Sequence, residues 1–157
     1  YVRIGALTAL ADFKDQLTGA HKDAVVADLV SLTERTVDAQ SGVSGKLVQG
    51  AYKAGKKVDI GLPEKAMRGL LPELASDLEP FWDEYAGGGR SGSFGEFLDA
   101  RKEQVSSILL ETADRQAGKV NNPTINKVYS PIRGKVAKIV EKTVPEIGDT
   151  LAKHVEG

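Results

Sequence analysis

The sequence predicts an all-α protein that folds as a compact bundle of six or seven helices. Apolar residues recur at a period near 3.6 along the chain, and no segment shows the strict apolar–polar alternation of a half-buried strand. The chain has 157 residues, of which 41% are hydrophobic, so it is long enough to bury one core. We therefore expect a single helical domain over residues 1–157.

Two helices are expected at the start of the chain. The first covers about Leu7 to Leu17 and ends at Gly19, because glycine favours the conformation that terminates a helix. The second covers about Lys22 to Gln40. Its apolar residues have the spacing of one helix face and are expected to be core; they are Val26, Leu29, Val30, Thr33 and Val37.

A third helix is expected from about Ser44 to Val58. It contains three glycines, at positions 45, 50 and 55. Glycine inside a helix costs about 1 kcal/mol relative to alanine. This composition indicates either close backbone packing or a loosely held helix.

Proline-containing segments follow. Leu62-Pro63-Glu64 and Leu71-Pro72-Glu73 each resemble a helix start, since proline is tolerated at the first helical position and glutamate suits the positive end of the helix dipole. Pro80 is expected to kink or restart the chain before a group of aromatic residues. We therefore predict two helix starts between residues 62 and 86.

The second half of the chain begins after a glycine-rich stretch at 87–92, which we interpret as a hinge or an exposed loop. Ser93 and Glu96 have the spacing of a capping box, and a long helix is expected from Phe94 to near Gly118. Asn122-Pro123 predicts the start of another helix, which Pro131 should bend. Val144-Pro145-Glu146 is expected to open a terminal helix that runs to about Val155.

The two halves, about 20–86 and 93–157, resemble each other. At an offset of 80, Val25 and Leu29 fall on Val105 and Leu109. One explanation is an old duplication of a helical unit with pseudo-twofold packing. The alternative is that two amphipathic stretches agree by chance.

No catalytic, metal or cofactor site is expected. Gly87, Gly89 and Gly92 match G-x-G-x-x-G, but a dinucleotide site needs a preceding strand, and the segment before this loop is helical or irregular. His21 and His154 do not have metal-ligand spacing, and the absence of cysteine excludes thiolate ligands and disulfides. We expect a protein that is not an enzyme; an enzyme that binds phosphate at 87–92 is the weaker alternative.

Two segments are locally basic, although the whole chain carries 21 Lys+Arg against 22 Asp+Glu. The overall balance gives no support for a nucleic-acid partner. A helix that is apolar on one side and basic on the other binds acidic partners or anionic membranes, although such a face is also ordinary solvent-exposed surface. The basic patch comprises Lys46, Lys53, Lys56, Lys57, Lys127, Arg133, Lys135, Lys138 and Lys142.

Two sets of apolar residues are candidates for an interface or an apolar-ligand site. The first lies on the two basic helices and comprises Leu47, Val48, Tyr52, Ile125, Val128 and Tyr129. The second is the aromatic group Phe81, Trp82 and Tyr85, which either anchors the core or lines a pocket. The question for the first set is whether it is sealed in the core or surrounds a cavity.

Several short segments resemble a family of small helical actinobacterial proteins without an assigned function. They are Val26-Ala27-Asp28-Leu29-Val30, Gly50-Ala51-Tyr52-Lys53-Ala54, Leu78-Glu79-Pro80-Phe81-Trp82, Phe94-Gly95-Glu96-Phe97-Leu98 and Ile132-Arg133-Gly134-Lys135. The resemblance covers the chain from about Leu10. It implies an all-helical fold, an actinobacterial origin and a cytoplasmic location, and it supplies no functional residues.

The sequence thus predicts a non-enzymatic binding or interaction module that associates with another protein or with itself. The alternative is a lipid or apolar-ligand binding protein, or a peripheral binder of anionic membranes, that uses the basic helices 44–58 and 123–142. In this alternative the glycine-containing helix 44–58 moves aside to admit an acyl chain. No stretch of the sequence is apolar enough for a transmembrane segment.

Overall fold

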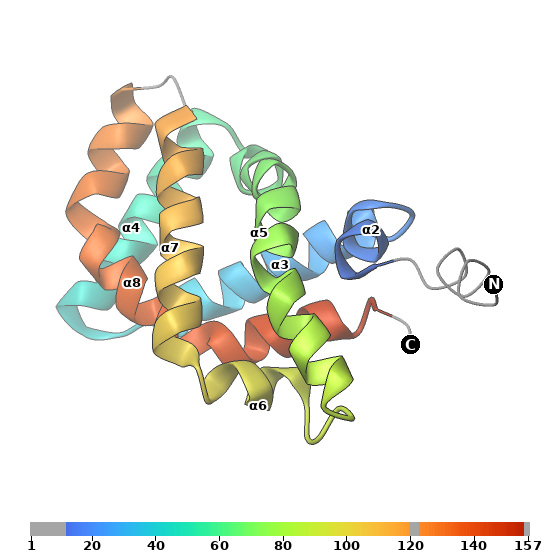
Figure 1. Ribbon diagram of the computed structural model, residues 1–157. Helices are drawn as coiled ribbons and strands as arrows, with labels where there is room; N and C mark the ends of the chain where they lie inside the picture. Colours follow the sequence, from blue (N-terminus) through green and yellow to red (C-terminus); the bar gives the residue numbers. More distant parts are fainter. Residues whose placement is uncertain (1–11, 120–122, 156–157) are drawn as a thin grey trace.

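The computed structural model describes residues 12–119 and 123–155. These residues form a bundle of helices without strands, which confirms the predicted fold class (Figure 1). The seven helices described are α2 (Phe13–Thr18), α3 (Lys22–Asp38), α4 (Gly42–Val58), α5 (Leu62–Gly87), α6 (Phe94–Asp99), α7 (Lys102–Lys119) and α8 (Pro123–Ala152). The expected start of the first helix, at Leu7, lies outside the described residues.

An aromatic core holds one end of the bundle together. It comprises Phe13, Trp82, Tyr85, Phe94 and Phe97, whose rings contact one another with centroids 5.0 to 6.4 Å apart. These rings come from α2, the last turns of α5, and α6. Ring contacts of this kind stabilise a core beyond the apolar area that they bury.

The expected second helix start near residue 71 is wrong. Pro72 and Pro80 both lie inside the continuous helix α5. An internal proline removes one backbone hydrogen bond and usually kinks a helix. The surrounding residues Leu71, Ala75 and Leu78 are completely buried, and this packing keeps α5 helical through both prolines.

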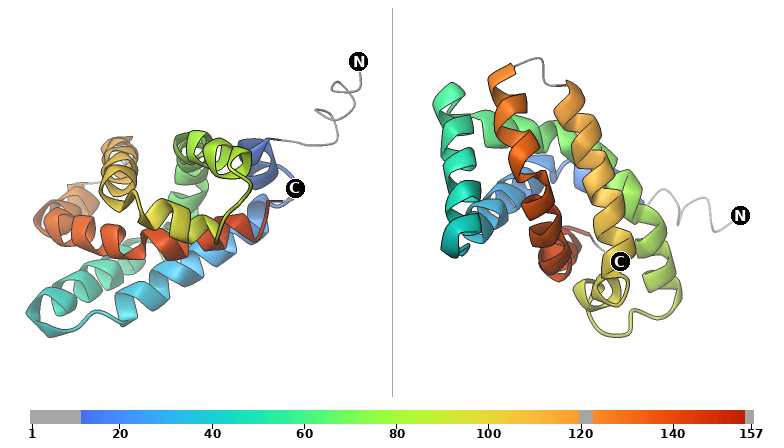
Figure 2. Two further views of the ribbon diagram at one scale, coloured as in Figure 1. Left: turned by 60° about the horizontal axis from the view of Figure 1, so that its bottom comes forward. Right: turned by 90° about the vertical axis from the view of Figure 1, so that its left-hand side faces the viewer.

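The expected terminal helix beginning at Val144 is also wrong, because α8 continues through Pro131 and Pro145 to Ala152. Its first part runs beside α4 and α7, and it then turns along the base of the molecule toward the C-terminus (Figure 1). One view shows α8 between a layer formed by α3 and α4 and a layer that contains α5 and α7 (Figure 2, left). The helix thus connects the two layers.

The single long helix expected from Phe94 to Gly118 is instead divided into α6 and α7. The turn at Ala100 and Arg101 contains no glycine or proline that would mark it. The Arg101 guanidinium donates to the Phe97 carbonyl at 3.0 Å and lies 3.8 Å from the centroid of the Phe97 ring. The Arg101 guanidinium also lies 3.3 Å from the Glu84 carboxylate of α5, so this side chain contacts both α5 and α6 at the turn.

The predicted capping box is confirmed at the start of α6. The Ser93 hydroxyl accepts from the Glu96 amide at 3.0 Å, and the Glu96 carboxylate accepts from the Ser93 amide at 3.2 Å. The glycine-rich stretch before it is exposed, and Gly89 and Gly92 adopt positive φ angles. The Tyr85 hydroxyl donates to the Gly92 carbonyl at 2.8 Å, which ties this loop to the aromatic core.

Helices α6 and α8 approach closely at a pair of glycines. A Cβ atom at Gly95 would overlap the Pro145 carbonyl, and one at Gly148 would lie 3.1 Å from the Gly95 backbone. The Gly95 amide donates to the Asp149 carboxylate at 2.8 Å. Only glycine fits at such a contact.

The order of the helices repeats along the chain. The short helix α2 and the long helix α3 are followed about 80 residues later by the short helix α6 and the long helix α7. Phe13 and Phe94 occupy equivalent positions in the short helices, and their rings contact each other with centroids 5.9 Å apart. This arrangement is what a duplication would leave, and the duplication itself stays a prediction.

Candidate functional site

An apolar cavity of about 430 Å³ lies at the end of the bundle away from the aromatic core. The first half of α5 borders it, whereas the last turns of α5 carry the aromatic core. Protein interiors contain few voids larger than a water molecule, whereas ligand pockets have volumes of roughly 300–1,000 Å³. The cavity is therefore of the size that accommodates a small ligand.

Five helices build the walls, and apolar side chains dominate them. The principal residues are Leu29, Leu32 and Val37 of α3; Val48, Ala51, Tyr52 and Gly55 of α4; Leu62, Met67, Leu70 and Leu74 of α5; Leu109 and Ala113 of α7; and Val128, Tyr129, Ile132, Val136, Ile139 and Val140 of α8. Among the described residues, Lys56 is the single charged residue of the lining. Such walls suit an apolar ligand.

Small residues opposite the apolar side of α8 contribute to the space of the cavity. Gly55 and Ala51 of α4 and Ala113 of α7 all lie in the lining. Along α8, no described side chain between residues 123 and 143 is fully buried, although this stretch carries an apolar stripe. In a bundle without a cavity this apolar stripe would be buried. Here it faces the cavity.

Two tyrosines of the lining are tied to carboxylates in the same manner. In the Tyr52 clamp, the Tyr52 hydroxyl and the Lys56 ammonium of α4 both lie 3.3 Å from the Glu34 carboxylate of α3. In the Tyr129 clamp, the Tyr129 hydroxyl and the Arg133 guanidinium of α8 each donate to the Asp114 carboxylate of α7 at 2.9 Å. Each clamp joins two consecutive helices.

The clamps shift the pKa values of their members. Burial, followed by the neighbouring Glu34, raises the pKa of Tyr52 to about 12. Burial, followed by the hydrogen bond to Asp114, raises the pKa of Tyr129 to about 12. The hydrogen bond from Arg133 holds the pKa of Asp114 below its usual range. Both tyrosines are thus neutral donors at neutral pH.

The candidate residues on the basic helices divide into several groups. Val48, Tyr52, Val128 and Tyr129 line the cavity, so the structure brings these four together from α4 and α8. Leu47 lies on the outer side of α4 with 51% of its surface exposed. The side chain of Ile125 lies outside the described residues.

The aromatic candidates Phe81, Trp82 and Tyr85 lie elsewhere. All three are buried in the core, and none of them borders the cavity. The Arg90 guanidinium lies 4.9 Å from the Trp82 ring centroid and covers it from the loop side. Their position is that of core anchors.

The basic residues also have distinct environments. Lys56 and Arg133 belong to the clamps. Lys135, Lys138 and Lys142 line a second pocket beside the cavity. Among the described residues, Lys46, Lys53, Lys57 and Lys127 are exposed and form no ion pair.

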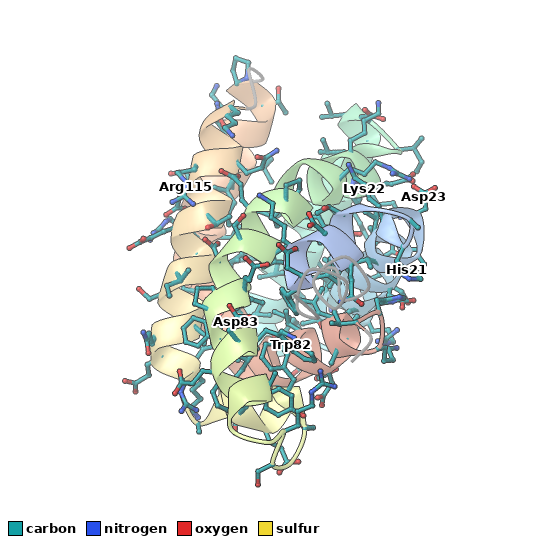
Figure 3. The ribbon with its side chains drawn as sticks, turned by 45° about the vertical axis from the view of Figure 1, so that its right-hand side comes forward. His21, Lys22, Asp23, Trp82, Asp83 and Arg115 are labelled. Atoms are coloured by element: carbon teal, nitrogen blue, oxygen red, sulfur yellow. The ribbon has the colours of Figure 1, made fainter. Side chains whose placement is uncertain are left out.

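The histidines lie away from the cavity. His154 contacts the Asp28 carboxylate at 2.6 Å, and its ring centroid is 6.5 Å from that of His21. Figure 3 shows His21, Lys22 and Asp23 at the opposite edge of the molecule from Arg115 of α7. Within residues 12–119 and 123–155, no group of three or more acidic or histidine side chains is arranged to hold a metal ion.

Several residues of the site were not expected from the sequence. Glu34 and Asp114 close the two clamps, and Met67 and Ala113 line the cavity. A signal for the clamps is present in the sequence, because Tyr52 and Tyr129 each precede a basic residue by four positions. Glu34 and Asp114 are separated by 80 residues, which is the offset of the predicted repeat.

A comparison with known protein families identifies the family of this chain. The profile of a family of unknown function, DUF6918, matches residues 13–155. The chain belongs to this family. The match covers every described helix of the DUF6918 chain, including all walls of the cavity.

The search of curated proteins and the search of solved structures each gave no match. In addition, no helix within the described residues has both the length and the apolar character needed to cross a membrane.

Proposed function

We propose that this DUF6918 protein binds an apolar ligand, such as an acyl chain, in the cavity between α3, α4, α5, α7 and α8. The observation that carries the proposal is that the apolar stripes of α4 and α8 face a half-open apolar cavity of about 430 Å³. The titratable residues of the lining are Tyr52, Lys56 and Tyr129, and each of them contacts a carboxylate. Because these groups are already engaged within the protein, the function that we propose is binding.

The energetic cost of an empty cavity supports occupancy. The cavity is half-open, and apolar lining that stays in contact with water forgoes about 25 cal/mol of stabilisation per Å². Typical domains have a total stability of about 5–15 kcal/mol. A ligand that binds the folded state alone would recover part of this loss by mass action.

Helix α4 is the wall through which a ligand would enter. Only Gly45 and Val48 of this helix are buried. Its polar attachments are the Tyr52 clamp and Gln49, whose amide donates to the Val37 and Gln40 carbonyls near the end of α3 at 3.2 and 2.9 Å. Because α4 has few buried contacts, its local opening costs little free energy.

The test fills the cavity without changing its polarity. Ala113→Phe places an aromatic ring in the lining, and Ala27→Phe makes the same change at an exposed position of α3. We expect the wild type and Ala27→Phe to bind the neutral dye Nile red and 1-decanol, and Ala113→Phe to lose at least about tenfold in affinity while it keeps its helical circular dichroism.

Native mass spectrometry of the protein from its own organism provides a second readout. An added mass of lipid size, absent after denaturation, would support the proposal. A bare protein that also fails to bind decanol would overturn it.

A second candidate function is docking to an anionic membrane surface. Four large apolar residues are prominently exposed within the described residues, namely Val43 (80%), Leu47 (51%), Val58 (44%) and Ile60 (79%), and all lie on α4 or in the turn after it. Lys46, Lys53 and Lys57 lie on the same outer side of α4 and form no ion pair within the described part of the chain. Apolar residues beside lysines are typical of interfacial helices.

Co-sedimentation with vesicles tests this second candidate. We expect binding to vesicles that contain phosphatidylserine, weak binding to pure phosphatidylcholine, and loss of binding in Leu47→Asp. If the same face serves association with another protein or with a second copy, vesicle binding will be absent and sedimentation velocity will show a concentration-dependent dimer that Leu47→Asp dissolves. A cytoplasmic location and an actinobacterial origin stay predictions of the sequence resemblance.

A further inference from the structure

A second pocket adjoins the apolar cavity and differs from it in polarity. Its volume is about 460 Å³, and it lies between the turn after α3, the first turns of α4, and the middle of α8. The two spaces share Val48, Ile139 and Thr143 as wall residues, so they are adjacent. We call this second space the lysine pocket.

The lysine pocket is positively charged. Lys135, Lys138 and Lys142 belong to its walls, and no aspartate or glutamate does. Their spacing of three and four residues places them on one side of α8. None of the three takes part in an ion pair among the described residues, so their ammonium groups are free to meet an anion.

The cations of the two clamps beside the apolar cavity are already neutralised. Lys56 is paired with Glu34, and Arg133 is paired with Asp114. Unlike the two clamps, the lysine pocket therefore carries uncompensated positive charge beside the cavity. The hydroxyls of Ser41 and Ser44 add further hydrogen-bonding groups to its walls.

Physical chemistry then restricts how an amphiphile would lie. Burying an ionised carboxylate or phosphate among apolar walls is strongly unfavourable, whereas its apolar chain gains free energy from the same burial. A chain in the cavity with its head group in the lysine pocket satisfies both requirements, and the two spaces are adjacent along Val48, Ile139 and Thr143.

We propose that the ligand is an amphiphile with an anionic head group, a carboxylate or a phosphate, whose chain fills the apolar cavity and whose head group lies against Lys135, Lys138 and Lys142. This inference rests on the proposed function, since it assigns the chemical class of the ligand for the same cavity.

Isothermal titration calorimetry at pH 8 tests the inference with three probes of equal chain length: decanoate, decyl phosphate and 1-decanol. We expect at least one anionic probe to bind the wild type about tenfold or more tighter than decanol, since charge-assisted hydrogen bonds contribute more than neutral ones. The anionic probe with the higher affinity identifies the head group.

A charge-matched pair of variants isolates the lysine pocket. The triple variant Lys135→Gln, Lys138→Gln, Lys142→Gln should lose the preference for the anion and bind decanol as the wild type does. The control Lys46→Gln, Lys53→Gln, Lys57→Gln removes the same charge from exposed positions of α4 that line neither space, and it should keep the preference.

The outcomes separate the two proposals. Equal affinity of the wild type for decanol and both anions overturns the head-group inference and leaves apolar-ligand binding intact. Failure of all three probes to bind overturns the proposed function and this inference with it. Binding of acetate or inorganic phosphate as tightly as the corresponding long-chain probe overturns the inference too, because the lysine pocket would then be a site for free anions.

Discussion

At the scale of single residues, the two clamps show how polar groups border an apolar cavity without remaining unpaired. Each tyrosine places its ring in the lining and its hydroxyl on a carboxylate, Glu34 or Asp114. A cation four residues later, Lys56 or Arg133, shares that carboxylate. This pairing allows α4 and α8 to present apolar rings inward and charge outward.

The raised tyrosine pKa values predict a loss of stability in alkali. Unfolding returns Tyr52 and Tyr129 to an ordinary pKa near 10, whereas both are about 12 in the folded protein. The unfolded state therefore releases protons first, and the free energy of unfolding should fall as the pH rises from about 10 to 12. Urea denaturation between pH 8 and 11 should show a steeper fall for the wild type than for the double variant Tyr52→Phe, Tyr129→Phe. Equal slopes would contradict the assigned pKa shifts.

The Gly95 contact predicts opposite effects of one substitution at two glycines. Gly95→Ala would force its Cβ into the Pro145 carbonyl and should lower the free energy of unfolding by about 1–3 kcal/mol or more. Gly134→Ala, in α8, meets no atom within 4 Å and should raise the free energy by about 0.5–1 kcal/mol. Chemical denaturation of both variants checks the pair, and an unchanged midpoint for Gly95→Ala would show that α6 and α8 are less close than described.

At the scale of elements, the helices differ in how firmly the core holds them. α5 has seven buried residues, whereas α4 has two, Gly45 and Val48. The glycine content of α4 suggested either close packing or loose attachment. Its three glycines differ in how closely they pack against other residues. Gly45 packs against the Gln40 backbone, Gly50 meets nothing within 4 Å, and Gly55 faces the Leu62 side chain.

The loose attachment of α4 predicts its behaviour in hydrogen exchange. Amides of α4 should exchange faster than those in the middle of α5, because local opening of α4 disrupts few buried contacts. A saturating concentration of 1-decanol should slow the exchange of α4 selectively. Protection of α4 equal to that of α5 in the free protein would argue against access to the cavity through this helix.

The sequence was sufficient to predict most helices but not their continuity. The 3.6-residue period and the capping box at Ser93 predicted α3, α4 and the start of α6. Proline was a poor guide, because Pro72 and Pro145 lie within helices whose packing compensates for the missing hydrogen bonds. The break at Ala100 and Arg101 contains no glycine or proline, so no local signal predicted it.

At the scale of the whole molecule, the two halves share one core. Phe13 of α2 contacts Phe94 of α6, and Trp82 of α5 contacts Phe94 as well. We expect fragments 12–88 and 89–155 each to be mostly unfolded alone, since neither can complete the aromatic core, and to regain helical circular dichroism when mixed. A fragment that is stably helical alone would show that one half has an independent core.

The candidate site could be predicted in part. The apolar stripes of α4 and α8 placed Val48, Tyr52, Val128 and Tyr129 together, since both helices were expected to be amphipathic. Whether these four residues face a packed core or a cavity depends on the size of the residues opposite them, such as Ala113 and Gly55. The amphipathic pattern of a helix does not indicate the size of the residues that it will face. The partners Glu34 and Asp114 lie on other helices, and only the folded arrangement brings them near.

The position of Trp82 has a practical consequence for spectroscopy. It is the only tryptophan of the chain, and it lies in the aromatic core without bordering the cavity, whereas Tyr52 and Tyr129 are in the cavity wall. Indole emission will therefore follow denaturation and remain nearly constant during a ligand titration. Tyrosine absorbance will respond to the ligand, so that one sample carries separate optical reporters for folding and for occupancy.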